Sequence, residues 1–219
     1  MSLAIFDLDN TLIEGDSDYL WGQFLVEQGI VDRDQYESTN ALFYEQYKAG
    51  TLDITAFLRF ALAPLAANPP EKLYEWRARY IEEKIRPILL EGARTLIQRH
   101  LQAGDTLLVI TATNLFVTEP IIGLYGISNI IATVPERIDG RFTGRFSGTP
   151  CFQEGKVRNL DQWLNETGHS LDRSWFYSDS HNDLPLLKRV DNPVAVDPDE
   201  KLKRFALDNN WPVISLRNQ

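Results

Sequence analysis

The chain has 219 residues, of which 43% are hydrophobic and 11% aromatic, enough for one core domain with an insertion or for two small domains. Its formal net charge of −9 and the lack of a basic cluster argue against a nucleic-acid partner and against an anionic membrane surface. No apolar run approaches membrane-spanning length, and the single cysteine, Cys151, excludes an internal disulfide and fits a reducing, cytoplasmic compartment.

The first element expected is a buried strand, the apolar run Leu3–Phe6. Asp7 and Asp9 follow it, and because strand residues two apart point the same way, we expect both carboxylates at the strand's carboxyl end. Two carboxylates that lie so near each other repel, so a proton, a metal cation or divergence of the chain must offset the repulsion. The alternative is that both are solvated turn residues, since Asp, Asn and Thr are common in turns. Two acids and no basic start also argue against a signal peptide.

A helical segment is expected next, at about residues 16–87. Apolar residues recur there at three- and four-residue spacing in four successive stretches, with Asp caps, Gly stops and one Pro-Pro start. We expect these helices to begin after residue 16, near Asp32, at Asp53 and after Pro69-Pro70. No strand pattern interrupts them, so residues 16–87 are interpreted as a helical subdomain inserted after the first strand.

Beyond residue 87, strands and helices alternate. Strands are predicted at 106–111, 129–134, 174–179, 192–197 and 212–216, with helices between them and a hairpin turn at Asp139-Gly140. This alternation predicts an α/β fold, a doubly wound and mostly parallel sheet with helices on both faces.

Ligands of such sheets bind beyond the carboxyl ends of the strands, so residues with reactive or polar side chains at these ends are candidates for the site. The first strand ends at residues 7–11, the second in Thr111, Ala112, Thr113 and Asn114, and the strand at 174–179 ends in a loop rich in acids, hydroxyls and amides. Lys156, at a helix start, can reach the same edge.

These four motifs occur in the order typical of one family: Asp-x-Asp-x-Thr, a hydrophobic strand ending in Thr, a Lys before a helix, and an Asp-x-x-Asn-Asp loop. The chain resembles the haloacid dehalogenase superfamily along its whole length, and within it the phosphoserine-phosphatase-like branch. The resemblance implies a Rossmann-like catalytic core at 1–15 and 88–219 with an inserted four-helix cap at 16–87.

The resemblance also implies roles in the hydrolysis of a small-molecule phosphomonoester. Asp7 would be the nucleophile that forms an aspartyl-phosphate, and Asp9 would protonate the leaving alcohol and later accept a proton from water. Thr111 would donate a hydrogen bond to a phosphoryl oxygen, and Lys156 would hold Asp7 and the phosphoryl group. Asn182 would contact the phosphate.

By the same resemblance the cofactor is Mg²⁺, a hard cation that prefers oxygen ligands and offsets the crowding of acids. Its ligands would be the Asp7 carboxylate, the Asp9 backbone carbonyl and Asp179, with Asp183 orienting a metal-bound water. The remaining residues assigned to substrate binding are Thr11 and Asp16.

Departures from the family pattern bear on the substrate. True dehalogenases lack the second acid, so Asp9 argues against that activity. Phosphoserine phosphatases usually carry Ser-Gly-Gly where this chain has Thr111-Ala112-Thr113, and Glu where Asp16 stands. Some bacterial members of this branch resemble histidinol-phosphate phosphatases, whose substrate has the amine but no carboxylate, and this resemblance favours L-histidinol phosphate over phosphoserine. Arginines of the helical segment can bind an acidic substrate group or be solvated: Arg59, Arg77 and Arg79.

Other interpretations remain open. Taken singly, Lys156 is a solvated lysine and Asp183 a helix N-cap. A phospho-aspartate signalling module uses similar residues, although the insertion argues against it, and a phosphotransferase is a third alternative. The aromatic residues of the helical segment are expected mostly in its core, with a minority facing substrate: Trp21, Phe24, Phe43, Tyr44 and Phe57. The oligomeric state is not predicted.

Overall fold

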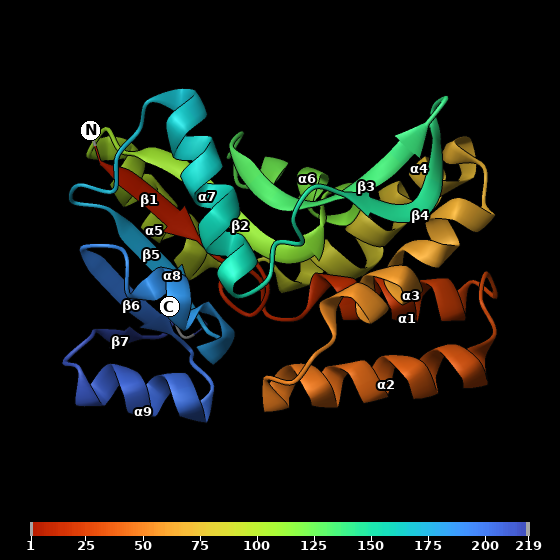
Figure 1. Cartoon of the computed structure of the whole chain (residues 1–219), viewed down its shortest axis with the longest axis horizontal. Coiled ribbons are helices and arrows are strands. Elements are labelled where there is room, and N and C mark those ends of the chain that lie inside the picture. The colour runs from red at the N-terminus through yellow and green to blue at the C-terminus, as the bar shows by residue number, and fades with distance from the viewer. Residues whose placement is uncertain (1, 218–219) are drawn as a thin grey trace.

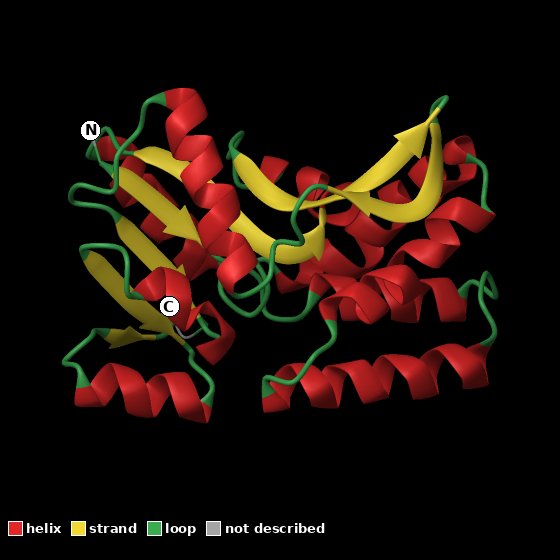
Figure 2. Ribbon diagram, in the orientation of Figure 1, coloured by secondary structure: helices red, strands yellow, loops and turns green. Residues whose placement is uncertain are grey.

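A computed structural model describes residues 2–217, which form a seven-stranded sheet in the order β4-β3-β2-β1-β5-β6-β7 (Figure 1, Figure 2). Neighbouring strands run parallel, except that β4 pairs antiparallel with β3. The strands are β1 (Leu3–Phe6), β2 (Thr106–Asn114), β3 (Ile130–Ile138), β4 (Arg141–Ser147), β5 (Trp175–Ser178), β6 (Asn192–Val196) and β7 (Val213–Ile214).

The buried strand β1 lies in the middle of the sheet, and its side chains alternate between two apolar clusters. Ala4 and Phe6 belong to the cluster that contains residues of α5 and α6, whereas Leu3 and Ile5 belong to the cluster formed with α7, α8 and α9. Helices therefore cover both faces of the sheet, and the predicted α/β, doubly wound class is confirmed. These helices are α5 (Glu91–Gln102), α6 (Leu115–Gly123), α7 (Glu154–Thr167), α8 (Leu184–Leu187) and α9 (Glu200–Asp208).

The predicted helical segment lies between β1 and α5. Asp16, Asp32 and Asp53 cap its first three helices by accepting hydrogen bonds from backbone N–H groups of the following turn. Within residues 2–217, no helix combines the length and apolarity that crossing a bilayer requires. The four helices, called the helical insertion below, are α1 (Ser17–Glu27), α2 (Arg33–Ala49), α3 (Ile54–Ala67) and α4 (Pro70–Tyr80).

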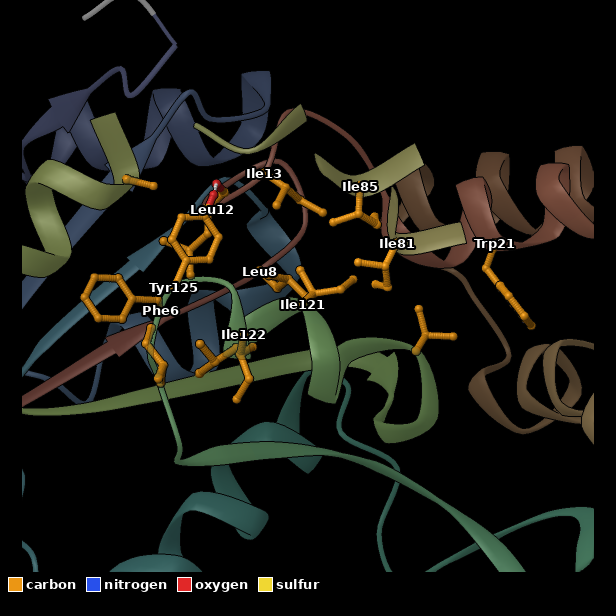
Figure 3. Packing of buried hydrophobic residues seen from close by; sticks show 14 of the residues in the cluster. Phe6, Leu8, Leu12, Ile13, Trp21, Ile81, Ile85, Ile121, Ile122 and Tyr125 are labelled. Carbon is orange, nitrogen blue, oxygen red and sulfur yellow. Dashed lines mark hydrogen bonds between the residues drawn. The ribbon is translucent and has the colours of Figure 1, made fainter. Parts of the chain in front are cut away.

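One apolar cluster joins the helical insertion to the sheet (Figure 3). It runs from Phe6 of β1 through Ile13 and Ile85 to Trp21 of α1, and each of these side chains is buried. Burial of one such side chain contributes about 1.5–3 kcal/mol. This cluster therefore fixes the base of the helical insertion against the core.

Two features near the sheet edge bear on the site. β2 runs to Asn114 and does not end at residue 111, so Thr111 and Thr113 lie within the strand. The Asp139-Gly140 turn joins β3 to β4 as predicted, with φ values of 50° and 79° that favour these residue types. The resulting hairpin reaches α3 of the helical insertion (Figure 1).

Candidate active site

The carboxyl end of β1 carries the two acids that the sequence singles out. The Asp7 backbone N–H donates to the carbonyl of Tyr177 in β5 at 2.9 Å, so the sheet ladder holds it in place. Asn10 then takes a positive φ of 55°, which turns the chain back on itself. Asp7 and Asp9 both line one cavity at this sheet edge, and the predicted convergence of strand ends is found.

Lys156 lies buried between two of these acids. Its Nζ donates to Asp7 Oδ1 at 2.7 Å and to Asp183 Oδ2 at 2.8 Å, and only 3% of the residue is exposed. Ser178 Oγ donates to the same Asp183 oxygen at 2.7 Å. A Cβ on Gly155 would lie 2.0 Å from a backbone carbonyl oxygen, so only glycine fits at this position in the first turn of α7, directly before Lys156. Lys156 is therefore a buried ion-pair partner, not a solvated lysine.

Asp9 is held by donors from both the core and the helical insertion. One oxygen accepts from the Ser17 backbone N–H at 2.6 Å, and the other accepts from Thr113 Oγ1 at 2.9 Å and from Thr111 Oγ1 at 3.4 Å. Thr113 thus makes the closer contact, which the sequence did not predict. With both oxygens held, the carboxyl group has a fixed orientation toward the cavity.

Burial and mutual repulsion raise the pKa values of these acids. Burial raises the pKa of Asp7 to about 7, with Asp183 and Asp9 adding to the shift and Lys156 opposing it. Burial and Asp16 raise the pKa of Asp9 to about 6. Burial also holds the pKa of Asp179 well above its usual range, and Asp7 adds to that shift. A site with this excess of carboxylates is stabilised by a bound cation.

The same oxygens suit magnesium. Among residues 2–217, no three His, Cys, Asp or Glu side chains form a compact metal cluster. Mg²⁺ does not need such a cluster, because it commonly keeps several waters and takes one or two carboxylates from the protein. The Asp7 and Asp179 carboxylates and the Asp9 carbonyl match that donor chemistry.

The remaining predicted residues lie in the loops that follow β1 and β5. Thr11 Oγ1 lies 3.5 Å from Asp179 Oδ1, and Thr11 is fully buried. Asn182 accepts from Gln153 Nε2 at 2.9 Å and donates to the backbone carbonyl of Tyr47 in α2 at 3.2 Å. Asp183 stands at the N-cap position of α8, but its side chain makes no capping hydrogen bond and instead faces Lys156.

The cavity extends from these acids to the inner face of the helical insertion. Asp16, which also caps α1, lines it, and burial raises the pKa of this carboxyl. No arginine lies among its lining residues in the described chain: Arg59 is exposed, while Arg77 and Arg79 pair with Glu119 and Glu83.

Several residues of the helical insertion that line the cavity were not predicted from the sequence. Phe43, Tyr44 and Phe57 line the cavity, and Phe57 also packs against the apolar core that contains Trp21 and Phe24. Which of these rings face substrate stays a prediction. A helical pattern predicts one buried stripe and does not say which part of the stripe borders a cavity. Polar residues lining the cavity that were not predicted are Asp18, Tyr19, Asn40 and Tyr47.

Comparison with known proteins identifies the family of the chain. The sequence profile of the haloacid dehalogenase-like hydrolases matches residues 4–188. A histidinol-phosphatase of Neisseria meningitidis serogroup C (strain 8013) is 49% identical over 220 residues, 99% of each chain. A protein of unknown function from Bordetella pertussis Tohama I is 43% identical, with a TM-score of 0.93 over 98% of both chains. A phosphoserine phosphatase solved as a phospho-aspartyl intermediate analogue is 20% identical, with a TM-score of 0.70 over 99% of this chain and 93% of that one, and shares the fold.

Proposed function

Because this chain belongs to the haloacid dehalogenase-like hydrolase family and is a phosphatase, we propose that it hydrolyses a small phosphomonoester through a phosphoryl group carried on Asp7. The observation that carries the proposal is the buried Lys156, which bridges Asp7 and Asp183 at the edge where the strands end. The proposed substrate is L-histidinol phosphate and the proposed cofactor is Mg²⁺.

Asp7 is the proposed nucleophile. Its carboxylate attacks phosphorus, the bond to the leaving alcohol oxygen breaks, and an aspartyl-phosphate forms. A carboxylate is a weak nucleophile, so alignment and charge neutralisation supply most of the acceleration. Lys156, 2.7 Å from Asp7, holds the attacking carboxylate in place and supplies a positive charge for the phosphoryl oxygens.

Asp9 is the proposed acid and base. It gives a proton to the leaving alkoxide and later takes one from the water that hydrolyses the aspartyl-phosphate, so its protonation state is restored. Its pKa of about 6 lies close to neutral pH, where both forms are accessible. Thr113 and the Ser17 N–H hold the carboxyl group for both transfers.

Magnesium would neutralise charge on the phosphoryl oxygens and fix their orientation. Asp7, the Asp9 carbonyl and Asp179 would hold the ion, and Asp183 would orient one of its waters. Thr111 and Asn182 would donate to phosphoryl oxygens. For this, Asn182 must release the Tyr47 carbonyl that it now contacts.

L-Histidinol phosphate fits the charge of the cavity. Asp16, which lines the cavity, would meet its amino group, and the relative from Neisseria meningitidis that is 49% identical is named for this activity. The carboxylate of phosphoserine would meet no arginine among the described lining residues, and Lys156 is already paired with two acids. Phosphoserine is therefore the less favoured substrate.

The helical insertion is proposed to act as a cap over the core, with residues 16–87 as cap and residues 1–15 and 88–219 as core. Polar contacts join the end of α2 to the core: Tyr47 Oη donates to Ser180 Oγ at 3.1 Å, and Lys201 Nζ donates to the Ala49 carbonyl at 3.1 Å. Opening these contacts would admit substrate, and closing them would exclude water. The single buried Cys151 fits the cytoplasm as the proposed compartment.

The proposal is tested by phosphate release from L-histidinol phosphate, O-phosphoserine and an aryl phosphate, with magnesium and again with a chelator. We expect release that the chelator abolishes, with L-histidinol phosphate as the best substrate. A persistent aspartyl-phosphate without release would indicate a signalling module, and transfer to an added alcohol in place of water a phosphotransferase. Equal release with chelator would contradict the magnesium requirement.

A further inference from the structure

One of the amide side chains that line the cavity has no hydrogen-bond partner in the described chain. Asn40 of α2 lines the cavity and is only 8% exposed, and its side chain makes no hydrogen bond within residues 2–217. The amide atoms of Asn40 are not among the enclosed polar atoms that lack a partner in the described chain, so they are open to the cavity. An amide whose donors and acceptor face a cavity unpaired can be satisfied by a ligand that enters it.

Asp18 of α1 borders the same cavity and is poorly matched as well. Its one hydrogen bond to another side chain comes from Asn114 Nδ2 at 3.4 Å, and no lysine or arginine pairs with it in the described chain. Burial raises the pKa of Asp18 to about 8, and Asp16 and Asp9 add to the shift. A ligand that brings a positive N–H group here would stabilise the charged carboxylate.

Aromatic rings form the wall beside these two polar groups. Phe43, Tyr44 and Phe57 line the cavity, and the rings of Phe43 and Phe57 pack edge to face with centroids 5.5 Å apart. Aromatic faces favour a flat ring or a cation placed against them. The wall therefore fits a planar group better than a flexible polar chain.

We propose that Asp18 and Asn40 form a subsite that binds a flat nitrogen heterocycle at the end of the substrate remote from the phosphate. The carboxylate of Asp18 accepts an N–H of the ring, and the amide of Asn40 hydrogen-bonds the second ring nitrogen. Asp16, which also caps α1, keeps its proposed role toward the amine nearer the phosphate. This inference rests on the proposed function and adds to it the residues that recognise the ring.

The test compares wild type with Asp18→Asn and Asn40→Leu on two substrates that share the amine: L-histidinol phosphate, which has the ring, and O-phosphoethanolamine, which lacks it. Losing one hydrogen bond to a charged or buried group lowers kcat/KM about 10- to 100-fold. We expect that loss for L-histidinol phosphate, mainly through KM, so that the preference for the ring collapses in both variants. The matched control is Asp34→Asn, which removes an exposed carboxylate in the first turn of α2 and should keep the wild-type preference.

Equal losses on both substrates, or an unchanged preference for the ring, would overturn the subsite. Calorimetric titration with L-histidinol, which carries no phosphate, separates this outcome from failure of the proposed function. If wild type binds L-histidinol and the two variants do not, the subsite stands even where no phosphate is released. If wild type releases phosphate but binds L-histidinol no better than the variants do, only the subsite fails.

Discussion

Two groups of polar residues line the cavity, and they differ in how many hydrogen bonds and ion pairs they make within the protein. The phosphate end is the group around Asp7 and Asp9, and the inner end is the group around Asp18 and Asn40. At the phosphate end, Lys156 bridges Asp7 and Asp183 at 2.7 and 2.8 Å, and Asp9 accepts from core and insertion. At the inner end, the Asp18 carboxylate accepts one long side-chain hydrogen bond, from Asn114 Nδ2 at 3.4 Å, and Asn40 makes no side-chain hydrogen bond within the described chain.

This difference corresponds to two tasks. Donors and charges fixed before substrate arrives stabilise a reacting group without reorganising, which suits the phosphoryl transfer common to every substrate. Groups left unpaired are satisfied only by the correct ligand, and a ligand without the matching atoms leaves them unpaired, which gives discrimination. The phosphate end is therefore prepared for chemistry and the inner end for selection, and the following variants test this division.

Asp7→Asn should have the largest effect. An amide oxygen cannot serve as the nucleophile, so phosphate release should fall by about 10⁴-fold or more. Lys156 keeps Asp183 as its partner, so cooperative thermal unfolding should persist. Turnover close to that of wild type would show that Asp7 is not the nucleophile.

Asp9→Asn should slow both chemical steps. Removing a general acid and base costs about 10²- to 10⁴-fold. Rapid-quench kinetics should show slower formation and slower hydrolysis of the phosphorylated protein. Thr113→Val, which removes one donor to Asp9, is the milder companion variant; a loss as large as that of Asp9→Asn would mean that Thr113 does more than orient the carboxyl group.

Lys156→Met should destabilise the fold as well as remove activity. It leaves Asp7 and Asp183 buried without their cation, and breaking such a pair costs about 3–5 kcal/mol. Urea unfolding at pH 8 measures the change in free energy. The control is Lys72→Met in the exposed pair with Glu75 at 3.5 Å, where the change should stay below about 1 kcal/mol. A similar loss of unfolding free energy in both variants would contradict the role of Lys156 as the buried cation that Asp7 and Asp183 require.

Asp18→Asn should have the smallest effect of these variants, a change in how the free energy of unfolding depends on pH. The folded-state pKa of Asp18, about 8, lies above its unfolded value, so between about pH 4 and 8 the folded state binds more protons than the unfolded state. Wild-type stability therefore falls as pH rises through this window. The free energy of unfolding of Asp18→Asn relative to wild type should therefore grow from pH 4 to 8, by about 1.4 kcal/mol for each pH unit over which the folded state holds the extra proton.

This comparison is made by urea unfolding in the presence of a chelator, so that metal binding adds no pH dependence of its own. Asp34→Asn, which removes an exposed carboxylate, should show no such slope. A difference between Asp18→Asn and wild type that stays constant with pH would mean that Asp18 is ionised in the folded protein at pH 4.

Much of the fold follows from local signals in the sequence. The apolar run at Leu3–Phe6 and the Asp caps at residues 16, 32 and 53 act over one strand or one helical turn, and the structure places β1 and three helix starts there. The extension of β2 to Asn114 was missed, because it depends on pairing with β3, which involves residues distant in sequence.

The candidate site divides in the same way. Asp7, Asp9 and Asp183 follow strand ends, and the topology of a parallel sheet brings such positions together. Asn40 lies one helical turn beyond Tyr36 on the buried face of α2. In the sequence, a polar residue at this position indicates an interruption of the apolar face and not a binding residue. Asp18 reads as an acid placed favourably at a helix N-terminus. Only the packing of α1 and α2 around the cavity indicates their proposed role.

The most direct test of Asp7 as the nucleophile follows the phosphoryl group itself. Wild-type protein is mixed with L-histidinol phosphate and magnesium, quenched in acid during turnover, digested, and examined by mass spectrometry. We expect a phosphoryl group on Asp7, formed and lost at the rate of phosphate release. Phosphate release with no phosphorylated peptide, or with the group on another residue, would contradict it.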